Sequence, residues 1–146
     1  MESSSGAGPA DLKYSAEGLW VRIRDGLAIV GLTDRAQAQL GCAVDIELPR
    51  PGAHVGRSEH LGTVEASKVA FDLVSPLSGQ VLAVNQRLAE SPELINSSPF
   101  SDAWLVKITL DDPGELDSLL SAQQYAKSSG VPSLRRRFEA PPDRGY

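Results

Sequence analysis

Short runs of apolar and alternating apolar and polar residues occupy most of this chain and predict a fold built from strands. Such runs cover residues 20–23, 27–32, 44–48, 63–64, 69–74, 81–84 and 104–110. Gly and Pro residues separate them, and Asp25-Gly26 is typical of a hairpin turn. Many short strands with frequent turns favour a mostly β protein, an antiparallel sandwich or flattened barrel with short helices at its edges.

Two helices are predicted beside the strands. The first begins at Thr33, a good N-cap residue, and ends at Gly41, a typical helix stop. The second begins at Asp112, which can cap it, and Glu115 is spaced to reach back as in a capping box. A stripe of leucines is expected to dock this C-terminal helix, which fades after Tyr125.

The length of 146 residues suits one domain, which we place at residues 14–130. We expect residues 1–13 to be a flexible N-terminal segment, and residues 131–146 to be a tail containing the run Arg135-Arg136-Arg137. Residues 85–102 are predicted to form a long ordered loop with a helical turn near its middle.

The composition narrows the function classes. The formal net charge of −5 argues against non-specific nucleic-acid binding. No apolar run approaches the ~20 residues that a membrane span needs, and the N-terminus does not read as a secretory signal. The single cysteine, Cys42, rules out an internal disulfide and suits a reducing cytoplasm. No other residues lie at metal-ligand spacing from His54 or His60, and the chain contains no recognisable set of catalytic residues.

One lysine stands out by its position. Lys68 lies between two strand-like runs, so it is predicted at the tip of a hairpin, where another enzyme can reach its amine. A second turn, Ser75-Pro-Leu-Ser-Gly79, follows the returning strand. An ordinary solvated lysine in a turn is the alternative interpretation.

This stretch resembles the attachment site of lipoyl carrier proteins, in particular the H protein of the glycine cleavage system. That family has a glutamate three residues before the modified lysine, here Glu65, and a Ser-Pro-x-Ser-Gly turn after it. The similarity runs from about Tyr14 to about Tyr125. It implies the hybrid barrel-sandwich fold with a C-terminal helix, lipoate joined to Lys68 by an amide bond, and Glu65 and Asp72 near the lipoyl arm.

The sequence departs from that family at the arm site. Glycine cleavage H proteins usually have His-Glu-Trp-Val at the first strand, where this chain has Gly18-Leu19-Trp20-Val21. The family's glutamate helps to hold the aminomethyl amine, and Leu19 can neither accept a hydrogen bond nor pair with a cation. We therefore favour a lipoate-binding protein that carries sulfur intermediates in cytoplasmic sulfur oxidation with a heterodisulfide-reductase-like complex. The alternative is a glycine cleavage H protein that serves the decarboxylase and the aminomethyltransferase.

Both hypotheses describe a monomeric, non-catalytic carrier that a lipoate ligase or lipoyl transferase modifies. A third possibility is an interaction module with the same fold in which Lys68 is never acylated. Biotin carriage fits less well, because biotin sites resemble Met-Lys-Met and Lys68 has Ser67 and Val69 beside it.

Overall fold

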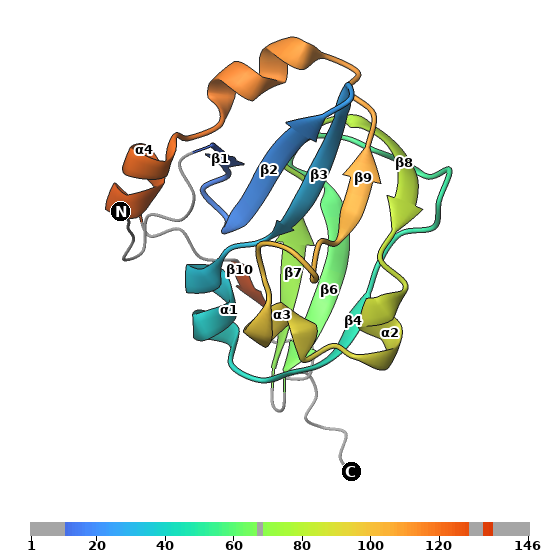
Figure 1. Cartoon of the computed structure of the whole chain (residues 1–146), viewed down its shortest axis with the longest axis vertical. Coiled ribbons are helices and arrows are strands. Elements are labelled where there is room, and N and C mark those ends of the chain that lie inside the picture. Colours follow the sequence, from blue (N-terminus) through green and yellow to red (C-terminus); the bar gives the residue numbers. More distant parts are fainter. Residues whose placement is uncertain (1–10, 67–68, 129–132, 136–146) are drawn as a thin grey trace.

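The computed structural model describes residues 11–66, 69–128 and 133–135, which form two antiparallel sheets with short helices at their edges (Figure 1). Lys68 lies outside the described residues, as do residues 1–10, 129–132 and 136–146. The mostly β sandwich-like architecture agrees with the fold class that the sequence predicts.

The first sheet has six strands in the order β1-β2-β3-β9-β8-β5. Their bounds are Lys13–Tyr14, Leu19–Arg24, Leu27–Leu32, Val106–Ile108, Gly79–Val84 and His54–Val55. Strands β2 and β3 form the predicted hairpin, and both turn residues, Asp25 and Gly26, have positive φ angles of 55° and 78°. That pair of angles is what a two-residue hairpin turn of type I′ requires.

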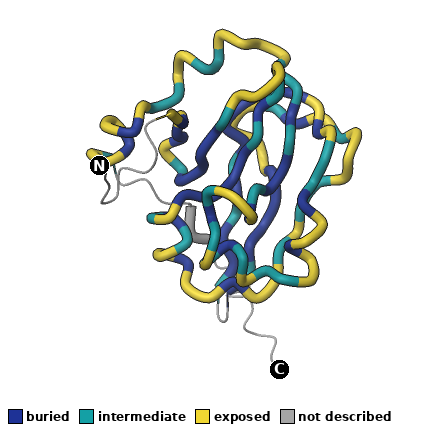
Figure 2. Tube along the Cα trace, viewed as in Figure 1, coloured by how far each residue is buried: buried dark blue, intermediate teal, exposed yellow. Residues whose placement is uncertain are grey.

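The second sheet has four strands in the order β10-β7-β6-β4. Their bounds are Ser133–Arg135, Ala70–Val74, His60–Ala66 and Ala43–Glu47. The main core is formed by apolar side chains of both sheets, with buried residues running through the strands (Figure 2). It includes Leu19, Val21, Val30, Leu32, Val64, Phe71, Leu73, Leu77, Val81, Val106 and Ile108.

Among the described residues, five short helical segments flank the sheets: α1, α2, α3, the 3-10 helix η1, and α4. They span Asp34–Leu40, Arg87–Glu90, Leu94–Ser97, Pro113–Ser118 and Ala122–Lys127. Helix α1 is as predicted, because the Thr33 hydroxyl accepts from the Ala36 N–H and Gly41 follows the helix with a φ of 82°. In the part of the chain that the structure describes, no helix has the length and apolar character to cross a membrane.

The single C-terminal helix predicted from Asp112 onward is instead two segments. Asp112 caps η1 by accepting from the Gly114 N–H, but the Glu115 carboxylate accepts from the N–H and the hydroxyl of Ser78, at 2.7 and 2.8 Å. Glu115 therefore holds the turn after β7 rather than completing a capping box. A separate capping box at Ser121 starts α4.

Other boundaries also differ from the sequence-based prediction. Strand β9 covers only Val106–Ile108, and α2 was not predicted. The register of β4 shifts between Ala43 and Asp45, and Val44, an apolar residue of the alternating run 44–48, is 51% exposed. Order begins before residue 14, because Leu12 is buried.

A second cluster docks α4 against β1 and β2. The rings of Tyr14 and Tyr125 stack at 4.9 Å, and the Tyr125 hydroxyl lies 2.6 Å from the Thr33 hydroxyl. The Arg35 guanidinium lies over the Tyr125 ring and donates to the backbone carbonyls of Tyr125 and Ser128. Burial raises the pKa of both tyrosines above the ordinary value. The end of α4 is thereby fixed to the start of α1.

Candidate functional site

Strands β6 and β7 form the hairpin that carries the predicted attachment lysine. Glu65 pairs with Ala70 and Thr63 with Asp72, and the Ala66 N–H donates to the Val69 carbonyl at 2.9 Å. Only two residues, Ser67 and Lys68, connect Ala66 to Val69. They lie outside the described residues, but the flanking register is that of a tight hairpin.

The base of this hairpin is firmly packed. Val64, Phe71 and Leu73 are buried in the main core. Gly62 lies so close to β4 that a Cβ atom there would clash with the backbone carbonyl of Glu47. The described part of the hairpin is therefore a firmly packed support on both sides of the Ser67-Lys68 connection.

Polar side chains lie along one face of the hairpin. Residues that pair across antiparallel strands share a face, so Thr63, Glu65, Ala70 and Asp72 point to the same side. Thr63 is buried and donates to Asp72 at 3.5 Å, and Nε2 of His60 lies 3.1 Å from the Thr63 hydroxyl and 3.7 Å from the Asp72 carboxylate. Glu65 and Asp72 thus lie on the same face of the β6–β7 hairpin.

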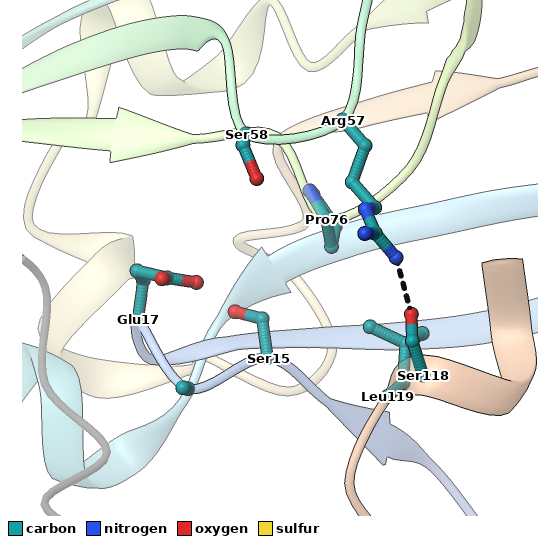
Figure 3. A pocket seen from close by; sticks show the side chains of 8 residues that line it. Ser15, Glu17, Arg57, Ser58, Pro76, Ser118 and Leu119 are labelled. Atoms are coloured by element: carbon teal, nitrogen blue, oxygen red, sulfur yellow. Dashed lines mark hydrogen bonds between the residues drawn. The ribbon is translucent and has the colours of Figure 1, made fainter.

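A polar cavity of about 210 Å³ opens beside the turn that follows β7 (Figure 3). Arg57 reaches across it to donate to the Ser118 hydroxyl at 2.6 Å, and the Glu17 carboxylate is directed toward the same space. Its lining residues are Ser15, Ala16, Glu17, Arg57, Ser58, Pro76, Ser118 and Leu119. Sequence reasoning missed this cavity, because Arg57 and Ser118 are far apart in the chain and form no local motif.

The departures at the first strand have a structural explanation. The Leu19 side chain is 0% exposed and belongs to the main core, while the Leu19 N–H donates to the Ser15 hydroxyl at 3.2 Å. Gly18 has a φ of 89°, in the left-handed region that favours glycine. Position 19 therefore contributes apolar packing. The carboxylate that lines the cavity belongs to Glu17.

The remaining candidate residues form no site. Cys42 is a free, exposed cysteine. His54 pairs with Asp111 at 2.5 Å on the surface. Within residues 11–66, 69–128 and 133–135, no group of three or more His, Cys, Asp and Glu side chains is placed to hold a metal ion.

Comparison with known proteins gives a consistent result. The family model described as glycine cleavage H-protein matches residues 12–130. A probable glycine cleavage system H protein of Aeropyrum pernix is 44% identical over 88% of this chain and 87% of its own length. A glycine cleavage system H protein of Symbiobacterium thermophilum is 48% identical over 80% of this chain and 91% of its own.

The fold agrees as well. The crystal structure of a glycine cleavage system H protein from Mycobacterium marinum aligns with a TM-score of 0.75 and 35% identity, covering 81% of this chain and 95% of that one. The chain belongs to the glycine cleavage H-protein family. Glycine cleavage H proteins carry lipoate attached covalently to a lysine.

The residues present fit that group. The hairpin has the tight two-residue tip, the glutamate and the second carboxylate that the resemblance implies, at Glu65 and Asp72. Lipoate requires only one exposed primary amine and no metal or buried charge. The relatives named here are all glycine cleavage proteins, so the comparisons support the glycine cleavage alternative better than sulfur carriage, for which they give no support.

Proposed function

We propose that this protein is the lipoate-carrying H protein of a glycine cleavage system, with Lys68 as the attachment residue. It acts as a non-catalytic carrier of the aminomethyl group between the decarboxylase and the aminomethyltransferase. Membership of the glycine cleavage H-protein family over residues 12–130 is the observation that carries this proposal. The tight β6–β7 hairpin, whose connection contains Lys68, supports the choice of residue.

The chain's own residues present the lysine and receive the arm. The packed β6–β7 hairpin supports the connection that contains Lys68. A lipoate ligase or lipoyl transferase brings a lipoyl group with an activated carboxyl, and the lysine amine attacks its carboxyl carbon. The amide bond forms as the bond to the activating group breaks and the amine loses its proton. Once attached, lipoate supplies a disulfide ring whose opening provides a sulfur for the transferred group. Asp72, close to Thr63 and His60, is the carboxylate that we assign to the side of the arm.

The attachment residue is tested by mass. Intact protein from its native cells, with peptide mapping, is expected to show a lipoyl increment on Lys68. Lys68→Arg is expected to abolish it without lowering the unfolding temperature, since only a primary amine is acylated. Lys127→Arg, the same change at an exposed lysine of α4, is the matched control and leaves the increment intact. An unmodified Lys68 in cells whose other lipoyl proteins are loaded would support the interaction module instead.

Recognition of the hairpin is tested separately. Glu65→Ala is expected to slow lipoylation while changing stability little, because Glu65 is only partly buried and lies near the tip. The control is Glu93→Ala, a glutamate just before α3 and remote from the hairpin in sequence. Equal lipoylation rates in the two variants would show that Glu65 is not read by the lipoylating enzyme.

The cargo is tested by glycine–bicarbonate exchange. The lipoylated protein, added to the decarboxylase, is expected to support exchange at a rate similar to that of another H protein. The buried Leu19, which leaves position 19 without a carboxylate, favours sulfur carriage as the second candidate. Absence of exchange, together with reduction of the arm by a heterodisulfide-reductase-like complex, would establish that second function.

A further inference from the structure

The C-terminal tail adds a strand to the attachment hairpin. Strand β10 pairs antiparallel with β7, with Ser133 opposite Asp72, Leu134 opposite Phe71 and Arg135 opposite Ala70. It is the outermost strand of the four-stranded sheet and lies beside β7 in Figure 1. These residues lie after the 12–130 stretch that the family model matches.

Strand β10 meets the hydrogen-bonding edge of β7. The Val69 carbonyl faces β6, because it accepts from the Ala66 N–H. Backbone groups alternate in direction along a strand, so the N–H and C=O groups of Ala70 and Asp72 face away from β6 and toward β10. The Phe71 amide faces β6. Without β10, β7 would be an open edge ready to pair with another chain.

Few residues hold β10 on β7, and the opposite net charges of the tail and the rest of the chain favour the pairing. Three residues of β10 pair with β7, so local opening costs much less than global unfolding. Residues 131–146 hold four arginines and two acidic residues, a formal charge of +2 in a chain of −5, which leaves −7 on the remainder. Arg35 fixes the carbonyl of Ser128, five residues before β10, so the tail starts from a fixed point and its effective concentration at β7 is high.

The position of β10 conflicts with a large partner at the hairpin. Neighbouring strands lie about 4.8 Å apart, and Arg135 is opposite Ala70, two residues after Lys68. A protein interface of ordinary size covers about 800 Å² on each partner, so an enzyme that encloses the lysine also reaches the outer edge of β7. The tail and the enzyme therefore compete for the same strip of backbone.

We propose that β10 is a displaceable cover of the β7 edge, and that the lipoylating enzyme displaces it with an extended segment of its own that pairs with β7. This inference rests on the proposed function, because it assumes that Lys68 is lipoylated. It assigns to the tail a role in limiting access to the hairpin, and to the β7 edge a role in binding a partner by strand addition.

Hydrogen exchange tests the cover. In the full chain, the amides of Ala70 and Asp72 are expected to be protected. In a chain ending at Ser128, both are expected to exchange fast, while the Phe71 amide, which faces β6, stays protected and serves as the internal control. Free exchange of Ala70 and Asp72 in the full chain would overturn the inference.

Lipoylation rates test the competition. At limiting enzyme, the rate is proportional to the fraction of chains with an open β7 edge, so removing β10 is expected to raise it by about three- to ten-fold. Ser133→Pro, which removes a backbone donor from β10, is expected to have the same effect. Ala140→Pro, the same change outside β10, is the control and leaves the rate unchanged.

The outcomes separate the two proposals. If the chain ending at Ser128 and Ser133→Pro were lipoylated no faster than the full chain, the cover would be overturned and the carrier function would stand. Slower lipoylation of these variants would show that the tail helps the enzyme to bind. Failure of every form, including the full chain, to accept lipoate would overturn the proposed function and this inference together.

Discussion

Replacing Leu19 by glutamate introduces the carboxylate that the resemblance described under Sequence analysis implies at this position, and it tests whether position 19 belongs to the core. Leu19 is 0% exposed and packs in the main core. Loss of a fully buried leucine side chain removes about 1.5–3 kcal/mol of transfer free energy. We expect the substitution to cost more than this, because the new group is ionisable.

The additional cost depends on pH. Burial raises the pKa of the new carboxyl. Each unit by which the pKa is raised lowers the free energy of unfolding by ~1.4 kcal/mol when the solution pH lies above both the ordinary and the raised pKa. A rise of two to three units adds about 3–4 kcal/mol at pH 7, for a total of about 4–7 kcal/mol. A domain of this kind has about 5–15 kcal/mol of stability in all, so Leu19→Glu is expected to be largely or partly unfolded at pH 7.

Urea unfolding at pH 7 and pH 5, followed by the fluorescence of the buried Trp20, measures the effect. The raised pKa means that the penalty is present at high pH and fades as the pH falls toward the ordinary value. The cost of Leu19→Glu relative to the natural protein should therefore shrink by up to about 2.7 kcal/mol between pH 7 and pH 5.

Leu19→Gln is the matched control, since glutamine has nearly the same shape as glutamate and no titratable group. Its free energy of unfolding relative to the natural protein should be independent of pH over this range. If Leu19→Glu were as stable as the natural protein at pH 7, position 19 would be open to solvent. The core assignment of Leu19 would then be refuted.

Three further predictions follow from packing and burial. The pKa values of Tyr14 and Tyr125 are raised in the folded state, so the stability that is present at neutral pH should be lost above about pH 10. The free energy of unfolding should fall by roughly 1.4 kcal/mol per pH unit for each tyrosine. In alkaline urea titrations, Tyr125→Phe should halve that slope. Gly62→Ala should lower the free energy of unfolding by about 1–3 kcal/mol through its clash with β4, and an unchanged urea midpoint would contradict this packing. Glu115→Ala should cost about 1 kcal/mol by releasing the N–H and hydroxyl of Ser78, with Glu115→Gln losing less.

The sequence predicts the strands well because period-two alternation and turn residues are local signals. A few neighbouring residues predict the hairpin at Asp25-Gly26, helix α1 from its Thr33 cap, and the β6–β7 hairpin. The candidate residues Glu65 and Asp72 come together for the same reason, since both lie on that hairpin.

What the sequence misses depends on contacts between distant residues. Glu115 fits a capping box, yet the Ser78 turn, 37 residues away in the chain, takes both of its oxygens. Val44 fits an alternating strand, and a bulge turns it outward. Strand β10 has no strong pattern of its own and is specified by the open edge that β7 offers.

The placement of β10 bears on where another protein can be fused to this one. A partner fused at the C-terminus follows a strand that is paired with β7, whereas a partner fused at the N-terminus precedes β1, at the edge of the other sheet. Affinity tags and fluorescent reporters are therefore better attached before β1. A C-terminal tag would add steric hindrance near the β6–β7 hairpin and so slow the binding of an enzyme there. The choice of tagged end therefore affects the rate that a binding assay measures.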